Sequence, residues 1–255
     1  METAFIVLLG VYAAVFGLVI GSFLNVCIYR IPRGESLSKQ PSHCPACGAR
    51  IRPRDLVPVF SYLFLRGKCR SCGAPISARY PAVELLNCAC YIAVYAVYGL
   101  QPITAAYMLM CSALIVAAFV DFDHRIILDR IVIFLLAEGI LLAVFSRDTP
   151  WLERLVGLFA VSVPLLLICI FFGGFGEGDV KLMAACGLVL GWKLIVLSLV
   201  FGSIFGSVAG ITLIVRKKAT RRSEIAFGPW LGLGITLAML FGNTLITSYL
   251  RMIGL

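Results

Sequence analysis

Two aspartates are the side chains of this 255-residue sequence best placed for chemistry. Asp121 follows the apolar run 113–120, and Asp179 ends the glycine-rich sequence Gly173-Gly174-Phe175-Gly176-Glu177-Gly178-Asp179. Ionisable residues at the ends of apolar spans are costly in hydrocarbon, so they indicate function. Two carboxyls that share a proton suit peptide hydrolysis, because one activates water as a general base while the other polarises the scissile carbonyl.

Helix capping and ion translocation are the two alternatives for this pair. A short acid at a helix start accepts hydrogen bonds from free amides, and acids within spans serve as proton relays. The glycines before Asp179 favour the hydrolysis hypothesis over these alternatives. Glycines are poor helix formers, so they leave backbone beside the acid against which an extended peptide substrate can lie.

Four further acids are not expected to belong to the catalytic pair. Asp129 is expected to be the N-cap of the following span, and Asp123, two residues from Asp121, to be a solvated loop acid. Glu138 lies in the middle of a span, where a polar contact, a buried neutral carboxyl and a chemical role all remain open. Glu84 lies near a membrane interface, and the sequence assigns no role to it.

Four cysteines form a second candidate site. Cys44-Pro-Ala-Cys47 and Cys69-Arg-Ser-Cys72 are separated by 21 residues, and a glycine follows each pair. This spacing is close to that of a four-cysteine zinc ribbon, so we expect a structural zinc. His43 is not expected to be a ligand, because four cysteines complete a tetrahedral shell. A redox pair of the thioredoxin type would have one such motif beside a strand and a helix.

The elements that position these residues are membrane helices. The chain is 61% hydrophobic and 14% charged, with a mean hydropathy of +1.00, which predicts an all-α polytopic membrane protein. Continuous apolar runs exclude an outer-membrane barrel. About eight transmembrane helices are expected, at residues 5–28, 80–100, 103–120, 131–145, 155–172, 180–192, 194–215 and 227–250.

Basic residues set the topology. Residues 30–79 hold ten Lys and Arg against two acids, which places this segment in the cytoplasm and the N-terminus outside. The sixth span is short, so it could instead enter and leave the membrane on the same side. The basic run 216–222 would then lie outside, against the charge rule, so eight spans are preferred. The outer side then keeps only Arg147, Arg154, Lys193 and Arg251. The cytoplasmic location disfavours disulfides between the cysteine pairs.

Three regions follow from this topology. Residues 1–30 are the first transmembrane helix, residues 31–79 a small cytoplasmic zinc-ribbon-like loop domain, and residues 80–255 a seven-helix catalytic bundle in the membrane. The net charge of +9 is interpreted as an orientation signal. Nucleic-acid binding is the weaker interpretation, because the basic residues flank spans.

Helix dipoles suggest distinct roles for the two aspartates. Asp121 ends a helix, where a carboxylate is disfavoured, and Asp179 begins one, where a carboxylate is favoured. Asp121 is therefore expected to be the more often protonated member, and Asp179 the resting base. A nearby cation, Arg125 or Lys181, would reverse the order.

Several motifs together resemble those of the bacterial type IV prepilin peptidases, also described as leader peptidases and N-methyltransferases, which are GxGD-type aspartyl proteases. The matching sequences are Gly176-Glu177-Gly178-Asp179, Asp121-Phe122-Asp123-His124, both cysteine pairs, Gly21-Ser22-Phe23-Leu24-Asn25-Val26, Tyr29-Arg30-Ile31-Pro32 and Phe227-Gly228-Pro229. The likeness extends over almost the whole chain in the same order. One departure is Leu128 before Asp129, where many members have proline.

The resemblance implies a function. The aspartates matching Asp121 and Asp179 are that family's catalytic pair, which removes the leader of type IV prepilins or pseudopilins at the cytoplasmic face of the inner membrane. It further implies a role in type IV pilus or type II secretion systems, and N-methylation with S-adenosylmethionine. The methylation rests on the resemblance alone, because no residue pattern in the chain indicates a methyl-donor site. A proton-coupled transporter and a zinc-ribbon scaffold without chemistry are the rival classes, although we find no inverted repeat.

Overall fold

The computed structural model describes residues 2–39, 41–146, 148–172, 176–216 and 226–254. These residues are mostly helical and contain no strand, only two isolated bridges. The elements are α1 (Glu2–Arg30), η1 (Pro53–Leu56), α2 (Phe60–Phe64), α3 (Arg79–Tyr98), α4 (Pro102–His124), α5 (Asp129–Phe145), α6 (Trp151–Ala160), α7 (Ser162–Phe172), α8 (Glu177–Leu190), α9 (Trp192–Val215) and α10 (Gly228–Met252). The prediction of an all-α polytopic fold is confirmed.

The helices form two compact units, residues 1–116 and 117–255, which divide within α4. The division into residues 1–30, 31–79 and 80–255 stays a prediction. Six stretches of the described chain are long and apolar enough to span a membrane, and α6 with α7 forms one of them. Because α5 has 17 residues and α8 has 14, the count of eight also stays a prediction. Most of the basic run 216–222 used to choose it lies outside the described residues.

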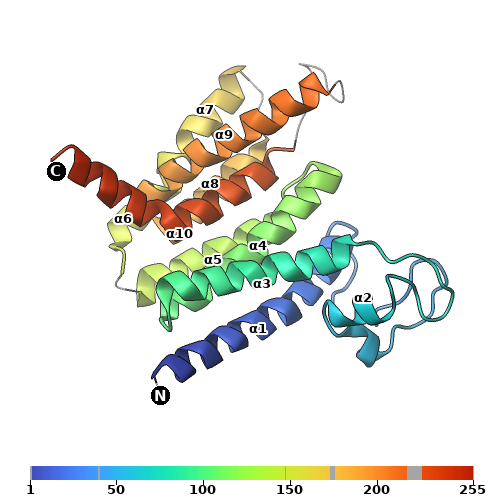
Figure 1. Ribbon diagram of the computed structural model, residues 1–255. Coiled ribbons are helices and arrows are strands. Elements are labelled where there is room, and N and C mark those ends of the chain that lie inside the picture. The colour runs from blue at the N-terminus through green and yellow to red at the C-terminus, as the bar shows by residue number, and fades with distance from the viewer. Residues whose placement is uncertain (1, 40, 147, 173–175, 217–225, 255) are drawn as a thin grey trace. The chain divides into compact units, whose positions relative to one another are not determined.

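In the first unit α1 packs along α3 (Figure 1). Two glycines on α1 let the backbones approach, since a Cβ at Gly17 would lie 2.7 Å from Cys88 Cα and one at Gly21 would lie 2.7 Å from Glu84 Cα. This is the small-residue spacing that membrane helices use for close contact. Asn87 crosses the same contact, where its side-chain amide donates to the Gly17 carbonyl at 2.8 Å.

Replacing Gly21 with alanine should separate these helices. We expect Gly21→Ala to lower the free energy of unfolding by about 1–3 kcal/mol, the usual cost of overpacking. Gly10→Ala on the same helix is the matched control, because its Cβ would meet only the Tyr95 ring, at 3.7 Å. Thermal unfolding in detergent measures both variants, and equal losses would contradict the proposed close approach.

In the second unit α8 is the central helix and contacts α5, α6, α7, α9 and α10. Its backbone meets that of α6 where Gly187 faces Gly157, with no room for a Cβ on either residue. The span made of α6 and α7 is interrupted at Val161. Pro164 explains the break, because its ring has no N–H and clashes with the carbonyl four residues earlier.

Arg154 corrects the start of one expected span. The sequence predicts a span from residue 155 with Arg154 just outside it, but Arg154 lies within α6 and has no exposed surface. Its guanidinium donates to the carbonyls of Leu188 and Val189. These are the last carbonyls of α8, which lack partners within their own helix and carry the negative end of its dipole. Arg154 therefore caps the end of α8 opposite Asp179.

Candidate active site and metal centre

Asp121 lies in the last turn of α4 and is buried, with 6% of its surface exposed. Its Oδ2 accepts a hydrogen bond of 2.9 Å from the backbone N–H of Gly228. Gly228 is the first residue of α10, and the amides in the first turn of a helix have no partner within that helix. The start of α10 thus holds the Asp121 carboxyl in place.

Asp179 is the third residue of α8 and is also buried. Its Oδ2 accepts the N–H of Gly176 at 3.3 Å, so its carboxyl turns back over the start of its own helix. Gly178 is required by packing, because a Cβ there would lie 2.8 Å from Ile127 Cβ. Ile127 lies in the connection that follows α4, so this glycine lets the start of α8 approach the end of α4.

The two carboxyls are close enough for their charges to interact. The end of α4 and the start of α8 bring the two carboxyls near each other. The expectation that dipoles distinguish them fails, because Asp121 also faces a helix start, that of α10. Each carboxyl accepts one backbone N–H from the first turn or N-cap of a helix, so the dipoles do not decide which is the acid. The assignment of Asp121 as the protonated member loses its basis.

Substitution of Gly228 tests whether the position of the Asp121 carboxyl matters for catalysis. A Cβ at this position would lie 2.7 Å from Asp121 Oδ2, so Gly228→Ala must displace the carboxyl. We expect kcat for peptide cleavage to fall about 10²-fold with a smaller change in KM, as for a misplaced catalytic group. Gly176→Ala is the matched control, since it keeps the N–H donor and its Cβ would approach Asp179 Oδ2 only to 3.5 Å. Equal kcat values for the two variants would contradict this role.

The neighbouring acids are separate from the pair. Asp129 is not the N-cap of α5, as the sequence suggested, because Leu128 holds that position and Asp129 opens the first turn. Its carboxylate pairs with Lys181 Nζ at 2.8 Å, which links α5 to α8 on an exposed surface. Asp123 is exposed, as expected, although it belongs to the last turn of α4 and not to a loop.

The two glutamates that the sequence left unassigned are both buried. Glu84 on α3 accepts the Val59 N–H at 2.7 Å, so it ties the loop between α1 and α3 to a membrane helix. Glu138 on α5 has no hydrogen-bond partner for either carboxyl oxygen among the described residues. A charged carboxyl without a partner is costly in an apolar interior, so this environment favours the neutral form.

The cysteine pairs form two knuckles of the same design. In the first knuckle, the Gly48 N–H donates to the Cys44 carbonyl at 2.8 Å, and the Cys44 N–H donates to the Ala49 carbonyl at 2.9 Å. In the second knuckle, the Gly73 N–H donates to the Cys69 carbonyl at 2.9 Å, and the Cys69 N–H donates to the Ala74 carbonyl at 2.8 Å. Gly48 and Gly73 have φ of +69° and +72°. Such angles favour glycine, which explains why one follows each pair.

The knuckles bring the four thiols together. The Sγ atoms of Cys44, Cys47, Cys69 and Cys72 lie within 4.8 Å of one another, and those of Cys44 and Cys72 are 4.0 Å apart. A tetrahedral zinc with bonds of about 2.3 Å separates its sulfurs by about 3.8 Å, so the cluster fits this ion. Backbone amides of Cys72 and Ser71 lower the pKa of Cys69 to about 7, which favours the thiolate that binds metal. His43 is not part of the cluster.

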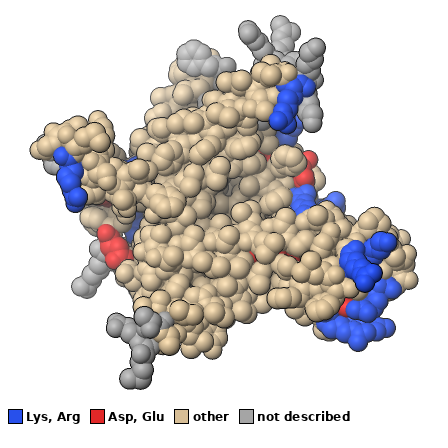
Figure 2. All heavy atoms as spheres, viewed as in Figure 1, with Lys and Arg blue, Asp and Glu red and all other residues tan. Residues whose placement is uncertain are grey.

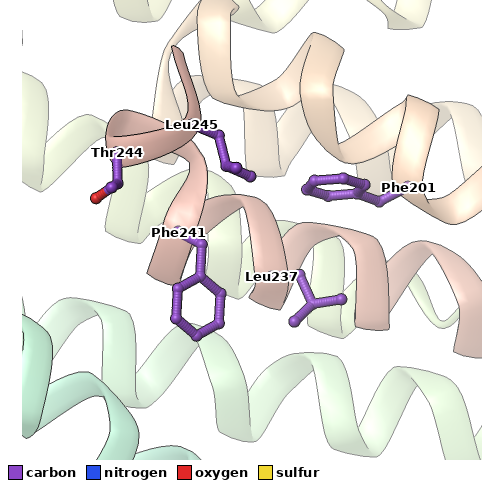
Figure 3. A pocket seen from close by; sticks show the side chains of 5 residues that line it. All are labelled: Phe201, Leu237, Phe241, Thr244 and Leu245. Carbon is purple, nitrogen blue, oxygen red and sulfur yellow. The ribbon is translucent and has the colours of Figure 1, made fainter. Parts of the chain in front are cut away.

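An apolar pocket of about 290 Å³ lies between α9 and α10. Its lining consists of Phe201 of α9 and of Leu237, Phe241, Thr244 and Leu245 of α10 (Figure 3). No charged side chain lines it, so it offers no group for carboxylate chemistry. For the same reason it does not suit S-adenosylmethionine, which carries a sulfonium, an amine and a carboxylate.

Comparison with known proteins identifies the family of the chain. Residues 108–211 match the model of the type IV leader peptidase family, and residues 15–98 match that of the bacterial peptidase A24 N-terminal domain. The chain belongs to the type IV leader peptidase family. Asp121 and Asp179 lie within the first match and all four cysteines within the second, whereas Gly228 lies outside both.

Curated relatives of this family extend the match over most of the chain. A prepilin leader peptidase/N-methyltransferase of Bacillus subtilis is 34% identical, covering 93% of this chain and 96% of its own length. Proteins of the same description from Aeromonas hydrophila and Pseudomonas aeruginosa are 33% and 32% identical, covering 92% and 93% of this chain and 91% and 92% of their own lengths. No solved structure matches the chain.

Proposed function

We propose that this chain is a membrane aspartyl peptidase that removes the leader from type IV prepilins or pseudopilins, with Asp121 and Asp179 as its catalytic pair. The observation that carries the proposal is the pair of buried carboxyls, each held by a backbone N–H at a helix start. Peptidase activity on prepilins is the activity of the family to which the chain belongs.

The pair supplies both proton transfers that peptide hydrolysis needs. One carboxylate takes a proton from water as the water attacks the scissile carbonyl carbon. The other carboxyl, still protonated, donates to the carbonyl oxygen, and a proton then passes to the leaving amine as the C–N bond breaks. The N–H donors from Gly176 and Gly228 fix one oxygen of each carboxyl, which leaves the other oxygen of each free of these donors.

N-methylation of the new N-terminus is the second activity. The relatives named above carry the name N-methyltransferase, which implies S-adenosylmethionine as the methyl donor. We assign no residue to the donor.

Zinc and membrane orientation complete the proposal. Cys44, Cys47, Cys69 and Cys72 would hold one structural zinc, which links two knuckles in a segment too small for a large core. The excess of basic residues supports a cytoplasmic location for residues 31–79 and an outside N-terminus in the bacterial inner membrane. Prepilins or pseudopilins and membrane lipid are the partners proposed, without nucleic acid.

Incubation of the purified protein with a prepilin and labelled S-adenosylmethionine tests the function. We expect a shortened product whose new N-terminal residue carries the label. A transporter or a scaffold would leave the prepilin intact, and that result would refute the proposal.

A further inference from the structure

An exposed apolar cluster lies on the segment between the two cysteine knuckles. It consists of Leu56, Val57, Phe60, Leu63 and Phe64, which we name the Phe64 patch. Phe60, Leu63 and Phe64 have the spacing that places side chains on one face of a helix. Phe64 is 84% exposed. Clustered apolar exposure of this kind marks a contact surface.

Two contacts hold the patch in place. Glu84, five residues inside α3, accepts the N–H of Val59, the residue before α2, at 2.7 Å. Five residues correspond to about 7–8 Å along a helix, so the start of α2 lies at the depth of the first turns of a membrane span. Val59 has φ of +61°, a strained conformation for a β-branched residue. The Glu84 contact is thus kept at a conformational cost.

The second contact joins the patch to the cysteine cluster. Arg70, between Cys69 and Cys72, donates to both carboxylate oxygens of Asp55 at 2.9 and 2.6 Å. Asp55 directly precedes the first residue of the patch. The patch is therefore fixed on one side to a knuckle and on the other to α3.

The surroundings of the patch are basic. Figure 2 shows Lys and Arg side chains gathered over the four-cysteine segment, residues 31–79, whereas few charges appear over the helices on this face. Arg52, Arg54, Arg66 and Lys68 flank the patch in sequence and are exposed. An apolar surface bordered by cations complements a leaflet of anionic lipid, because apolar groups enter the acyl boundary while Lys and Arg meet phosphates.

We propose that the Phe64 patch inserts into the interfacial zone of the bilayer beside α3, and that the flanking basic residues bind anionic lipid headgroups. The patch would then act as an anchor that sets the height of the cysteine cluster over the membrane. The anchor is independent of the peptidase chemistry proposed above, since it involves neither aspartate. It also gives the charge excess of residues 31–79 a use besides orientation.

Site-specific photocrosslinking in vesicles tests the anchor. The full chain is reconstituted in phosphatidylcholine with or without phosphatidylglycerol, with p-benzoylphenylalanine in place of either Phe64 or Ser71. Ser71 is exposed within the second knuckle and serves as the matched control. We expect several-fold more lipid adduct at position 64 than at position 71, with a further increase when phosphatidylglycerol is present.

The charge contribution is tested in the same assay. The Arg52→Gln/Arg54→Gln variant keeps the Asp55–Arg70 pair, so its loss of the phosphatidylglycerol effect would support headgroup binding. Adducts at position 64 to a second copy of the chain or to added prepilin would overturn the proposal. Absence of lipid adducts there, or equal labelling at the two positions, would overturn it as well. Because cleavage is not the readout, failure of the anchor is distinct from failure of the proposed function.

Discussion

Asp121→Asn and Asp179→Asn are each expected to reduce prepilin cleavage by about 10³-fold or more. An amide keeps the shape of the side chain but neither accepts the proton of the attacking water nor supplies one to the carbonyl. Because the two carboxyls act as one unit, the double variant should be no slower than the slower single variant. Initial cleavage rates of a purified prepilin in detergent give the measurement.

Two neighbouring acids provide controls for this experiment. Asp123→Asn on α4 and Asp129→Asn at the start of α5 change exposed carboxylates, so both variants should cleave within a few-fold of wild type. Near-normal cleavage by either Asp121→Asn or Asp179→Asn would remove that residue from the catalytic pair. Insertion into the membrane should be unchanged in all four variants.

Cys44→Ser is expected to abolish zinc binding and unfold the four-cysteine segment. Cys44 is the buried member of the cluster, and structural zinc in peptides of similar size supplies about 10–16 kcal/mol of folding free energy. Wild type should hold about one zinc per chain, and the variant almost none. Elemental analysis measures the metal, and trypsin, which cuts at the many Lys and Arg of residues 31–79, measures the loss of structure.

The membrane helices should be affected less than this segment. Cys88→Ser on α3 is the control, because Cys88 is not part of the cluster, and it should keep both the zinc and the protease resistance. A wild-type protein without metal, or one with a disulfide between the knuckles, would refute the zinc assignment.

The parts of the site that depend on local sequence could be predicted. Each knuckle forms from six consecutive residues, and the left-handed glycines Gly48 and Gly73 follow directly from the Cys-x-x-Cys-Gly pattern. Asp121 and Asp179 stood out because each borders an apolar run, so the hydrophobic pattern alone placed them at helix ends.

Contacts made by tertiary packing could not be predicted in this way. The Gly228 N–H reaches Asp121 across 107 residues of sequence. The hydrophobic pattern predicts a span from residue 227, but nothing in it indicates that the start of this span lies against Asp121. Arg154 directly precedes the span expected at residues 155–172, yet it lies within α6, buried against the end of α8. Asp129 was expected at the N-cap of α5 but is the first residue of the helix, so the N-cap is Leu128.

Binding of a transition-state mimic tests the catalytic pair most directly. A prepilin-derived peptide with a hydroxyethylene group in place of the scissile amide presents one hydroxyl to both carboxyls, as the tetrahedral intermediate does. Transition-state analogues bind about 10²-fold or more tighter than substrates when the catalytic groups are in place. We predict such tight binding to wild type and to Asp123→Asn, and its loss in both Asp121→Asn and Asp179→Asn, which should still bind uncleaved prepilin. Equal affinity of the mimic for wild type and either of the latter variants would contradict the assignment of Asp121 and Asp179.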